Sequence, residues 1–119
     1  MALKLVTMNQ NYQFVKVYKR GKNLVHPLLV TYVCKNKGNK GTFRIGITTS
    51  KKIGKAHDRN RARRLIKEAV RQLAPQIRPN VDLIFVARSK TCYTKLSPVK
   101  KVMESHLREA GVLNEKVAP

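Results

Sequence analysis

Residues 51–71 of this chain, KKIGKAHDRNRARRLIKEAVR, combine dense positive charge with apolar residues at helical spacing. The stretch holds nine of the 26 lysines and arginines but only two carboxylates, Asp58 and Glu68. At ~100° per residue, one sector of a helix over residues 59–73 collects the apolar side chains of Ala62, Leu65, Ile66, Ala69, Val70 and Leu73. The other side carries Asn60, Arg61, Arg63, Arg64, Lys67 and Arg71, with Arg59 near the boundary. The pattern predicts a helix that docks on a sheet and presents a basic row to solvent.

A basic row of this purity favours a polyanionic partner. A helix that needs only to be soluble intersperses Glu with Lys and gains i, i+4 pairs, whereas here Glu68 alone interrupts the row. Arginine forks onto phosphate oxygens and stacks on bases, which lysine does less well. A solvated charged face is the alternative explanation, but the net charge of +20 over 119 residues argues against it.

The rest of the chain predicts an α+β fold. The apolar patterns predict strands at 28–35, 42–50 and 81–88, the first two joined as an antiparallel hairpin by the turn-rich KNKGNKG. The expected boundary residues are Asn9 or Asn11 and Gly21 for a first helix, Asp58 and Pro75 for the basic helix, and Ser97, Pro98 and Gly111 for a last helix. The order α-β-β-α-β-α describes a single-domain sandwich over residues 1–119, with an ordered core at about 9–111 and a short frayed tail.

Few residues could support catalysis or hold a metal. All six carboxylates lie beyond residue 57, and no two of them form a recognisable motif. Cys34 and Cys92 are far apart, as are His26, His57 and His106, so we expect two reduced thiols and no metal site. The N-terminal MALKLVTMNQ lacks the apolar run of a signal peptide, and no stretch approaches the ~18 apolar residues of a membrane span. We therefore expect a cytoplasmic protein that does not associate with membranes.

Charge alone does not separate a DNA ligand from an RNA ligand. A recognition helix for the DNA major groove is expected within a helical motif such as helix-turn-helix, whereas this helix follows predicted strands and a basic loop. The sequence shows no signature of an RRM, a KH domain or a zinc knuckle. Composition and pattern thus indicate a nucleic-acid-binding α+β domain and leave the ligand open.

The longer stretch FRIGITTSKKIGKAHDRNRARRLIKEAVR resembles the signature of the protein subunit of bacterial ribonuclease P, whose hallmark is an RNR run, here Arg59, Asn60 and Arg61. NYQFVKVYKRG resembles the first helix of that family, LLVTYV and VDLIFVAR resemble its first and third strands, and PVKKVMESHLREAG resembles its closing helix. The resemblance implies an RNA-binding subunit with no catalytic residue of its own. It would assist a catalytic RNA and its bound Mg²⁺ in hydrolysing the 5′ leader from precursor tRNA.

The resemblance also implies two RNA contacts. The basic helix and the loop before it would bind the RNA subunit through Lys51, Lys52, Lys55, Arg59, Asn60, Arg61, Arg63, Arg64 and Lys67. A cleft between the first helix and the sheet would hold the single-stranded leader with Phe14, Tyr18, Val30, Tyr32 and Arg88. Aromatic rings stack unpaired bases with little dependence on base identity. Aromatic residues at helical spacing are, however, also the ordinary signal of core packing. For Tyr18 and Tyr32 the cleft is favoured, because their hydroxyls tolerate contact with water.

The family fold implies a left-handed βαβ crossover through the basic helix, although ~98% of such connections are right-handed. The implied partners are ribonuclease P RNA and the precursor tRNA leader, with no obligate protein partner. A ribosomal protein would share the charge but not a cleft for a single strand. A self-sufficient nuclease would need metal-binding carboxylates near the basic face, where only Asp58 and Glu68 lie.

Overall fold

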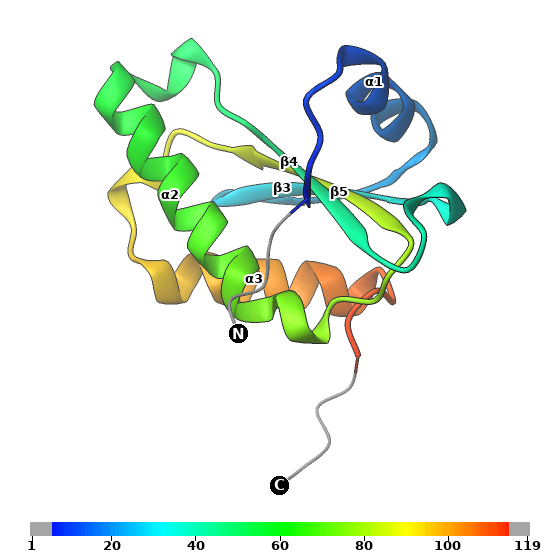
Figure 1. Cartoon of the computed structure of the whole chain (residues 1–119). Coiled ribbons are helices and arrows are strands. Elements are labelled where there is room, and N and C mark those ends of the chain that lie inside the picture. Colours follow the sequence, from blue (N-terminus) through cyan, green and yellow to red (C-terminus); the bar gives the residue numbers. More distant parts are fainter. Residues whose placement is uncertain (1–5, 115–119) are drawn as a thin grey trace, which may run out of the picture.

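The computed structural model describes residues 6–114, which form a five-stranded sheet with helices on both faces (Figure 1). The strands, in their order across the sheet, are β1 (Val6–Thr7), β4 (Phe43–Thr48), β5 (Val81–Ala87), β3 (Leu29–Lys35) and β2 (Lys22–His26). The helices are α1 (Asn11–Arg20) on one face, and α2 (Ala56–Leu73) and α3 (Leu96–Glu109) on the other. Four 3-10 turns lie at Lys37–Asn39, Lys51–Ile53, Ala74–Gln76 and Thr91–Tyr93. The predicted α+β class is confirmed.

The predicted hairpin between β3 and β4 is wrong, because β5 lies between these two strands. β5 pairs antiparallel with β3 and parallel with β4, so that Ile84 lies between Tyr32 and Gly46. β5 is buried over nearly its whole length, which favours a central place with both edges paired. β3 instead forms its hairpin with β2, a strand that the sequence analysis missed because Leu24 is its one buried residue.

The connection from β4 through α2 to β5 is left-handed, as the family resemblance implied. Figure 1 views the sheet from the β1 edge. The chain follows β4, passes below the sheet in α2 and returns in β5, the parallel neighbour one strand farther from the viewer. Pattern reasoning alone would have predicted the opposite hand, since right-handed crossovers dominate.

α2 begins three residues earlier than predicted, and α3 begins two residues earlier. The N-cap of α2 is Lys55, and Asp58 is the third residue of the helix, where its Oδ2 accepts the Lys55 N–H at 3.2 Å. A carboxylate in the first turn still complements the helix dipole there. The N-cap of α3 is Lys95 in place of Ser97, which lies inside the helix.

The predicted helix ends agree better with the structure. Gly21 follows α1 and donates its N–H to Val17 O at 2.7 Å. At the other end of α1 the N-cap is Gln10, not one of the predicted asparagines. α2 ends at Leu73, directly before the 3-10 turn that contains Pro75.

The chain after α3 remains packed as far as residue 114. Gly111, at φ +76°, turns the backbone out of the helix. Val112 and Leu113 are buried, and Leu113 forms an antiparallel bridge with Ile77. The prediction of a frayed tail is therefore wrong for residues 112–114, and residues 115–119 lie outside the described range.

The two faces of the sheet carry cores of unequal size. α2 and α3 cover one face with a large cluster that includes Ile66, Phe85 and Met103, all fully buried. The α1 face holds a small cluster of Met8, Val17, Cys34 and Ile84, against which Phe14, Tyr32 and Val86 are only half-buried. One short helix thus leaves part of this face accessible to a ligand.

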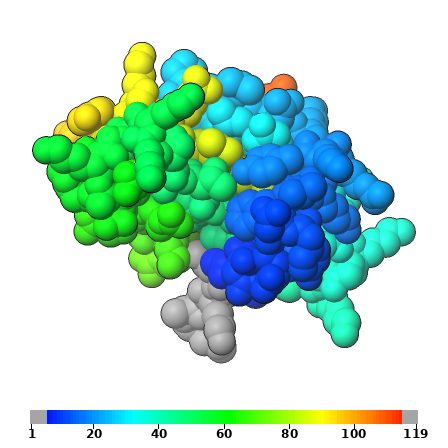
Figure 2. All heavy atoms as spheres, turned by 90° about the horizontal axis from the view of Figure 1, so that it is seen from above, coloured from blue at the N-terminus to red at the C-terminus, as the bar shows by residue number. Residues whose placement is uncertain are grey.

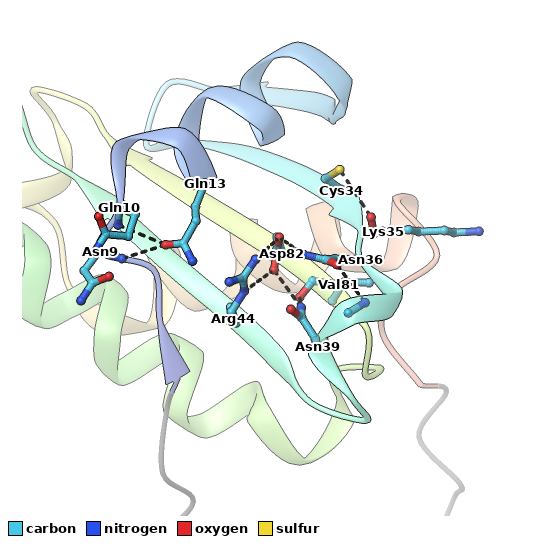
Figure 3. A network of polar contacts seen from close by, with 11 residues as sticks. Asn9, Gln10, Gln13, Cys34, Lys35, Asn36, Asn39, Arg44, Val81 and Asp82 are labelled. Carbon is cyan, nitrogen blue, oxygen red and sulfur yellow. Dashed lines mark hydrogen bonds and ion pairs between the residues drawn. The ribbon is translucent and has the colours of Figure 1, made fainter.

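A buried carboxylate organises the segment between β3 and β4 (Figure 3). Asp82 is 1% exposed, and Arg44 donates to both of its oxygens. The side-chain amides of Asn36 and Asn39 each donate to Asp82 at 2.8 Å. Burial alone would raise the pKa of Asp82, but the hydrogen bonds from Arg44, Asn39 and Asn36 outweigh it and lower the pKa. The charge is therefore retained at neutral pH and fixes residues 36–39 to the sheet.

Candidate nucleic-acid interface

The basic side chains of α2 form two rows, not one. Arg59, Arg63 and Lys67 follow one another at successive turns on the side of β4. Arg61 and Arg64 lie on the side of α3 and of the turn before it. The single row that the sequence predicted is thus divided by the neighbours of the helix.

The row on the β4 side is tied to the backbone that leads into α2. Arg59 Nη1 donates to Gly54 O at 2.9 Å, and Arg63 Nη2 donates to Thr49 Oγ1 at 3.1 Å. Both arginines were predicted to contact the RNA subunit. Their hydrogen bonds instead hold their guanidinium groups in place, which lowers the entropy cost of binding a phosphate.

Arg63 and Lys67 also line a hollow of about 230 Å³ whose other walls come from β1, β4 and α1. Phe14 and Gly46 belong to the same hollow. A cationic edge and an aromatic ring therefore meet in one place, and these groups suit the phosphate and the base of a single-stranded nucleotide.

On the α3 side, Arg61 is bonded to the turn before α3. Its Nε donates to Cys92 O at 2.8 Å, and its Nη2 donates to Thr94 O at 3.2 Å. Arg61 was predicted to contact RNA, and the structure uses much of its guanidinium to hold a protein segment. Arg64, beside it, is exposed.

The loop before α2 presents three lysines at the N-terminal end of that helix. Lys51, Lys52 and Lys55 are exposed, whereas Ile53 between them is buried and anchors the loop. Gly54 lies at φ +141°, a conformation that side chains rarely adopt. The loop thus adds positive charge at the end of α2 where Arg59 and the exposed Asn60 lie.

The α1 face forms the second candidate surface. The rings of Tyr18 and Tyr32 meet edge to face, with centroids 4.8 Å apart and an interplanar angle of 86°. Tyr18 is 40% exposed and Tyr32 half-buried, so both rings pack against protein and are still partly accessible to solvent. The two tyrosines that were assigned to the leader cleft thus contact each other, and their role in leader binding stays a prediction. Between α1 (blue) and α2 (green), Figure 2 shows surface atoms of the sheet in teal and yellow.

Farther along this face, Val30 has little surface to offer a leader. Val30 is buried, because β3 is an inner strand and Val30 lies between Val86 and Val25 on the neighbouring strands. Val25, on the edge strand β2, is exposed and supplies apolar surface instead. It shares a hollow of about 330 Å³ with Arg88, which is exposed just beyond β5. Val25 was not predicted at this site because β2 was not predicted as a strand.

The family model described as Ribonuclease P matches residues 4–111, a range that includes both surfaces. The chain belongs to the ribonuclease P protein family. The ribonuclease P protein component of Thermoanaerobacter sp. (strain X514) is 41% identical over 118 residues, which cover 98% of this chain and 100% of that protein. The corresponding protein of Clostridium novyi (strain NT) is 39% identical over 107 residues, or 90% of this chain and 95% of that protein. A solved structure of the Staphylococcus aureus RNase P protein matches with a TM-score of 0.81 at 32% identity, covering 93% of this chain and 100% of that chain.

As a ribonuclease P protein, the chain is the RNA-binding component of an endoribonuclease of tRNA 5′ processing. This membership decides against the ribosomal protein and the self-sufficient nuclease. Both cysteines are free and buried. Within residues 6–114, no helix is long and apolar enough to cross a membrane, and no group of three or more His, Cys, Asp or Glu could hold a metal ion.

Proposed function

We propose that this ribonuclease P protein binds the RNA subunit and the single-stranded 5′ leader on two different sides of α2. The observation that carries the proposal is the hollow in which Arg63 and Lys67 meet Phe14 and Gly46. From the family resemblance, Arg63 and Lys67 were expected to bind the RNA subunit. Their place beside an aromatic residue of α1 supports a role with the leader instead.

On the leader side, the residues of the α1 face would bind bases and phosphates separately. Tyr18 and Tyr32 are only partly buried, and unpaired bases would stack on their rings at about 1–3 kcal/mol per base. Arg63, Lys67 and, farther along, Arg88 are cations that phosphates can reach. Such contacts depend little on base identity, as a subunit that accepts many precursor tRNAs requires.

On the other side, the loop before α2 and the α3-facing part of the helix would bind the RNA subunit. The proposed contacts are Lys51, Lys52, Lys55, Asn60, Arg61 and Arg64. Arg59 lies at the boundary between the two sets. The protein would act by neutralising phosphates that otherwise repel one another where the leader approaches the RNA subunit.

Hydrolysis by the holoenzyme would use Mg²⁺ held mainly by RNA. The residues that the structure describes offer no cluster of metal ligands, so we assign the protein no metal-bound step. Its own residues bind and orient the two RNAs. The assembly would be cytoplasmic, with the chain acting as one domain over residues 1–119 and requiring no second protein.

Cleavage of a 5′-labelled precursor tRNA by a bacterial ribonuclease P RNA at low Mg²⁺, with and without the protein, tests this function. We expect strong stimulation at the mature 5′ end and no cleavage by the protein alone. The RNA alone at high Mg²⁺ is the control for active RNA. Active RNA that gains nothing from the protein would contradict the proposal.

A further inference from the structure

The turn between β5 and α3 presents an aromatic ring that neither proposed surface uses. Tyr93 is 77% exposed, more than any other large hydrophobic side chain of residues 6–114. The two residues before it, Thr91 and Cys92, are both buried. The chain therefore anchors this turn and still directs its tyrosine into solvent.

Four hydrogen bonds fix the turn around Tyr93. Thr91 Oγ1 donates to Leu28 O at 2.6 Å and accepts the Arg88 N–H at 2.8 Å. Arg61 donates to the carbonyl oxygens of Cys92 and Thr94, the residues on either side of Tyr93. An exposed aromatic residue on a fixed backbone is preorganised for binding, because little backbone freedom remains to be lost.

The surroundings of Tyr93 are strongly basic. Lys90 and Lys95, which lie on either side of Tyr93 in the sequence, are exposed. Arg61 also lines a hollow of about 260 Å³ beside the start of α3, together with Arg64, Leu65, Glu68 and Leu96. Glu68 in this hollow is ion-paired with Arg71 at 2.7 Å, which offsets its charge. An unpaired stretch of RNA fits such a surface, because its phosphates can contact the cationic groups and its bases can stack on the ring.

The phenol can add a polar contact. The nearby Cys92 and Asp58 raise the pKa of Tyr93, so its hydroxyl remains protonated at neutral pH and can donate a hydrogen bond to a phosphate. Asp58 is itself engaged, since it accepts the Lys55 N–H and lies 3.2 Å from His57 Nε2. Lys90, Lys95 and Arg61 outnumber this single carboxylate and offset its repulsion of an anion.

We propose that Tyr93 is a stacking platform for an unpaired base of the ribonuclease P RNA, and that Arg61 is its positioning residue. The proposal rests on the proposed function, of which it specifies one contact. The RNA subunit is the expected source of the base, because the turn adjoins the Arg61 and Arg64 side of α2. In Figures 1 and 2 this turn (yellow to orange) lies on the other side of α2 from α1 (blue), where the leader would bind.

Binding of the ribonuclease P RNA to purified variants, followed by titration, tests the platform. We expect Tyr93→Ala to raise the Kd about fivefold or more, the loss of one stacked base, and Tyr93→Phe to stay within about twofold, since the ring is retained. Tyr12→Ala is the matched control, because Tyr12 is a tyrosine 70% exposed on α1. Tyr93→Ala that binds the RNA as the wild type does would overturn the proposal.

Two further arms separate the alternatives. Holoenzymes assembled at saturating concentrations of wild-type protein or of Tyr93→Ala should bind precursor tRNA equally well. If Tyr93→Ala instead weakened only the binding of precursor tRNA, the stacked base would belong to the leader. Arg61→Lys keeps the charge but cannot fork onto two carbonyls, so it should weaken RNA binding more in the wild type than in Tyr93→Ala, where only the direct RNA contact of Arg61 remains to be lost. Equal losses in both backgrounds would refute the positioning role.

The same titrations distinguish a failure of this inference from a failure of the proposed function. Wild-type protein that neither binds the RNA nor stimulates cleavage would remove the proposed function, and the platform with it. Wild-type protein that does both, while Tyr93→Ala matches it, would remove the platform alone. Circular dichroism of each variant confirms that the fold is retained.

Discussion

Arg44 and Asp82 lie directly opposite each other on the parallel strands β4 and β5 and share a two-pronged ion pair, with Nε to Oδ1 at 2.9 Å and Nη2 to Oδ2 at 2.8 Å. The carboxylate is almost completely buried, whereas the arginine side chain is 22% exposed. The pair lies on the α1 face, so it supports the strands on which the proposed leader cleft is built. A buried charge of this kind is costly once its partner is removed.

Arg44→Met should lower the free energy of unfolding by about 3–5 kcal/mol, because it leaves the buried carboxylate with only two asparagine amides. Urea denaturation at pH 7 measures the change. Arg71→Met, which removes an exposed pair with Glu68, is the matched control and should leave the denaturation midpoint nearly unchanged. Equal midpoints for the two variants would show that burial does not set the strength of the Arg44 pair.

The buried His106 predicts a loss of stability at mildly acidic pH. Its Nδ1 shares a hydrogen bond with Thr31 Oγ1 at 2.8 Å. Burial lowers the pKa of His106, the charge of His26 lowers it further, and Glu109 opposes them. The unfolded chain binds this proton near pH 6.5 and the folded chain only at lower pH. The stability that the neutral, buried His106 contributes is therefore fully present above about pH 6.5. It is lost as the pH falls through that value toward the pKa of the folded state.

Chemical denaturation of wild type and His106→Gln between pH 7.5 and 5.5 tests this dependence. The wild type should become less stable across the range, and the variant should show a flatter profile from a lower starting stability. A slope that persists unchanged in the variant would assign the effect to another group.

Tyr18→Ala should weaken binding of precursor tRNA to the holoenzyme and leave binding of mature tRNA unaltered. The reason is that only the precursor carries the leader that would stack on Tyr18 and Tyr32, at about 1–3 kcal/mol per base. Tyr12→Ala on the same helix controls for the loss of an exposed tyrosine. Equal losses for precursor and mature tRNA would argue against a leader cleft at this place.

Charge reversal in the two rows of α2 should have different effects. Arg64→Glu is expected to weaken assembly with the RNA subunit and to reduce the salt dependence of log K by roughly 0.7–0.9 for each phosphate that the protein no longer neutralises. Arg63→Glu should mainly weaken precursor tRNA binding by the assembled holoenzyme, since Arg63 shares its hollow with Phe14. Filter binding over a range of salt concentrations measures both. If the two variants behaved alike, the division into rows would have no functional meaning.

The local patterns of this chain were largely predictable, and its long-range pairings were not. The helix α2 could be predicted from the periodic spacing of its apolar residues. This apolar stripe packs against the sheet, and the packing does not depend on the order in which the strands pair. Strand order depends on which edges pair, and nothing in residues 28–50 shows that β5, over thirty residues later, takes the place between β3 and β4. A nearby hairpin is the usual solution, and here it was wrong.

The site was predictable only in its composition. The identities of the basic and aromatic residues indicated RNA, and the family resemblance assigned them to two surfaces. Sequence gives no sign that Arg61 reaches carbonyl oxygens 31 and 33 positions later, since backbone acceptors are present at every residue. The exposure of Tyr93 could not be predicted from the sequence either, because it depends on the hydrogen bonds by which Arg61 and Thr91 hold the turn.

Gly46 determines how closely α1 approaches the sheet. A Cβ at this position would lie 2.5 Å from the Phe14 ring and 3.3 Å from the terminal methyl of Met8, so the ring rests directly on the backbone of β4. Any side chain here would force the Phe14 ring away from β4. The seat of this ring in the proposed leader site is therefore set by the absence of a single carbon atom, in a residue that has no functional group of its own.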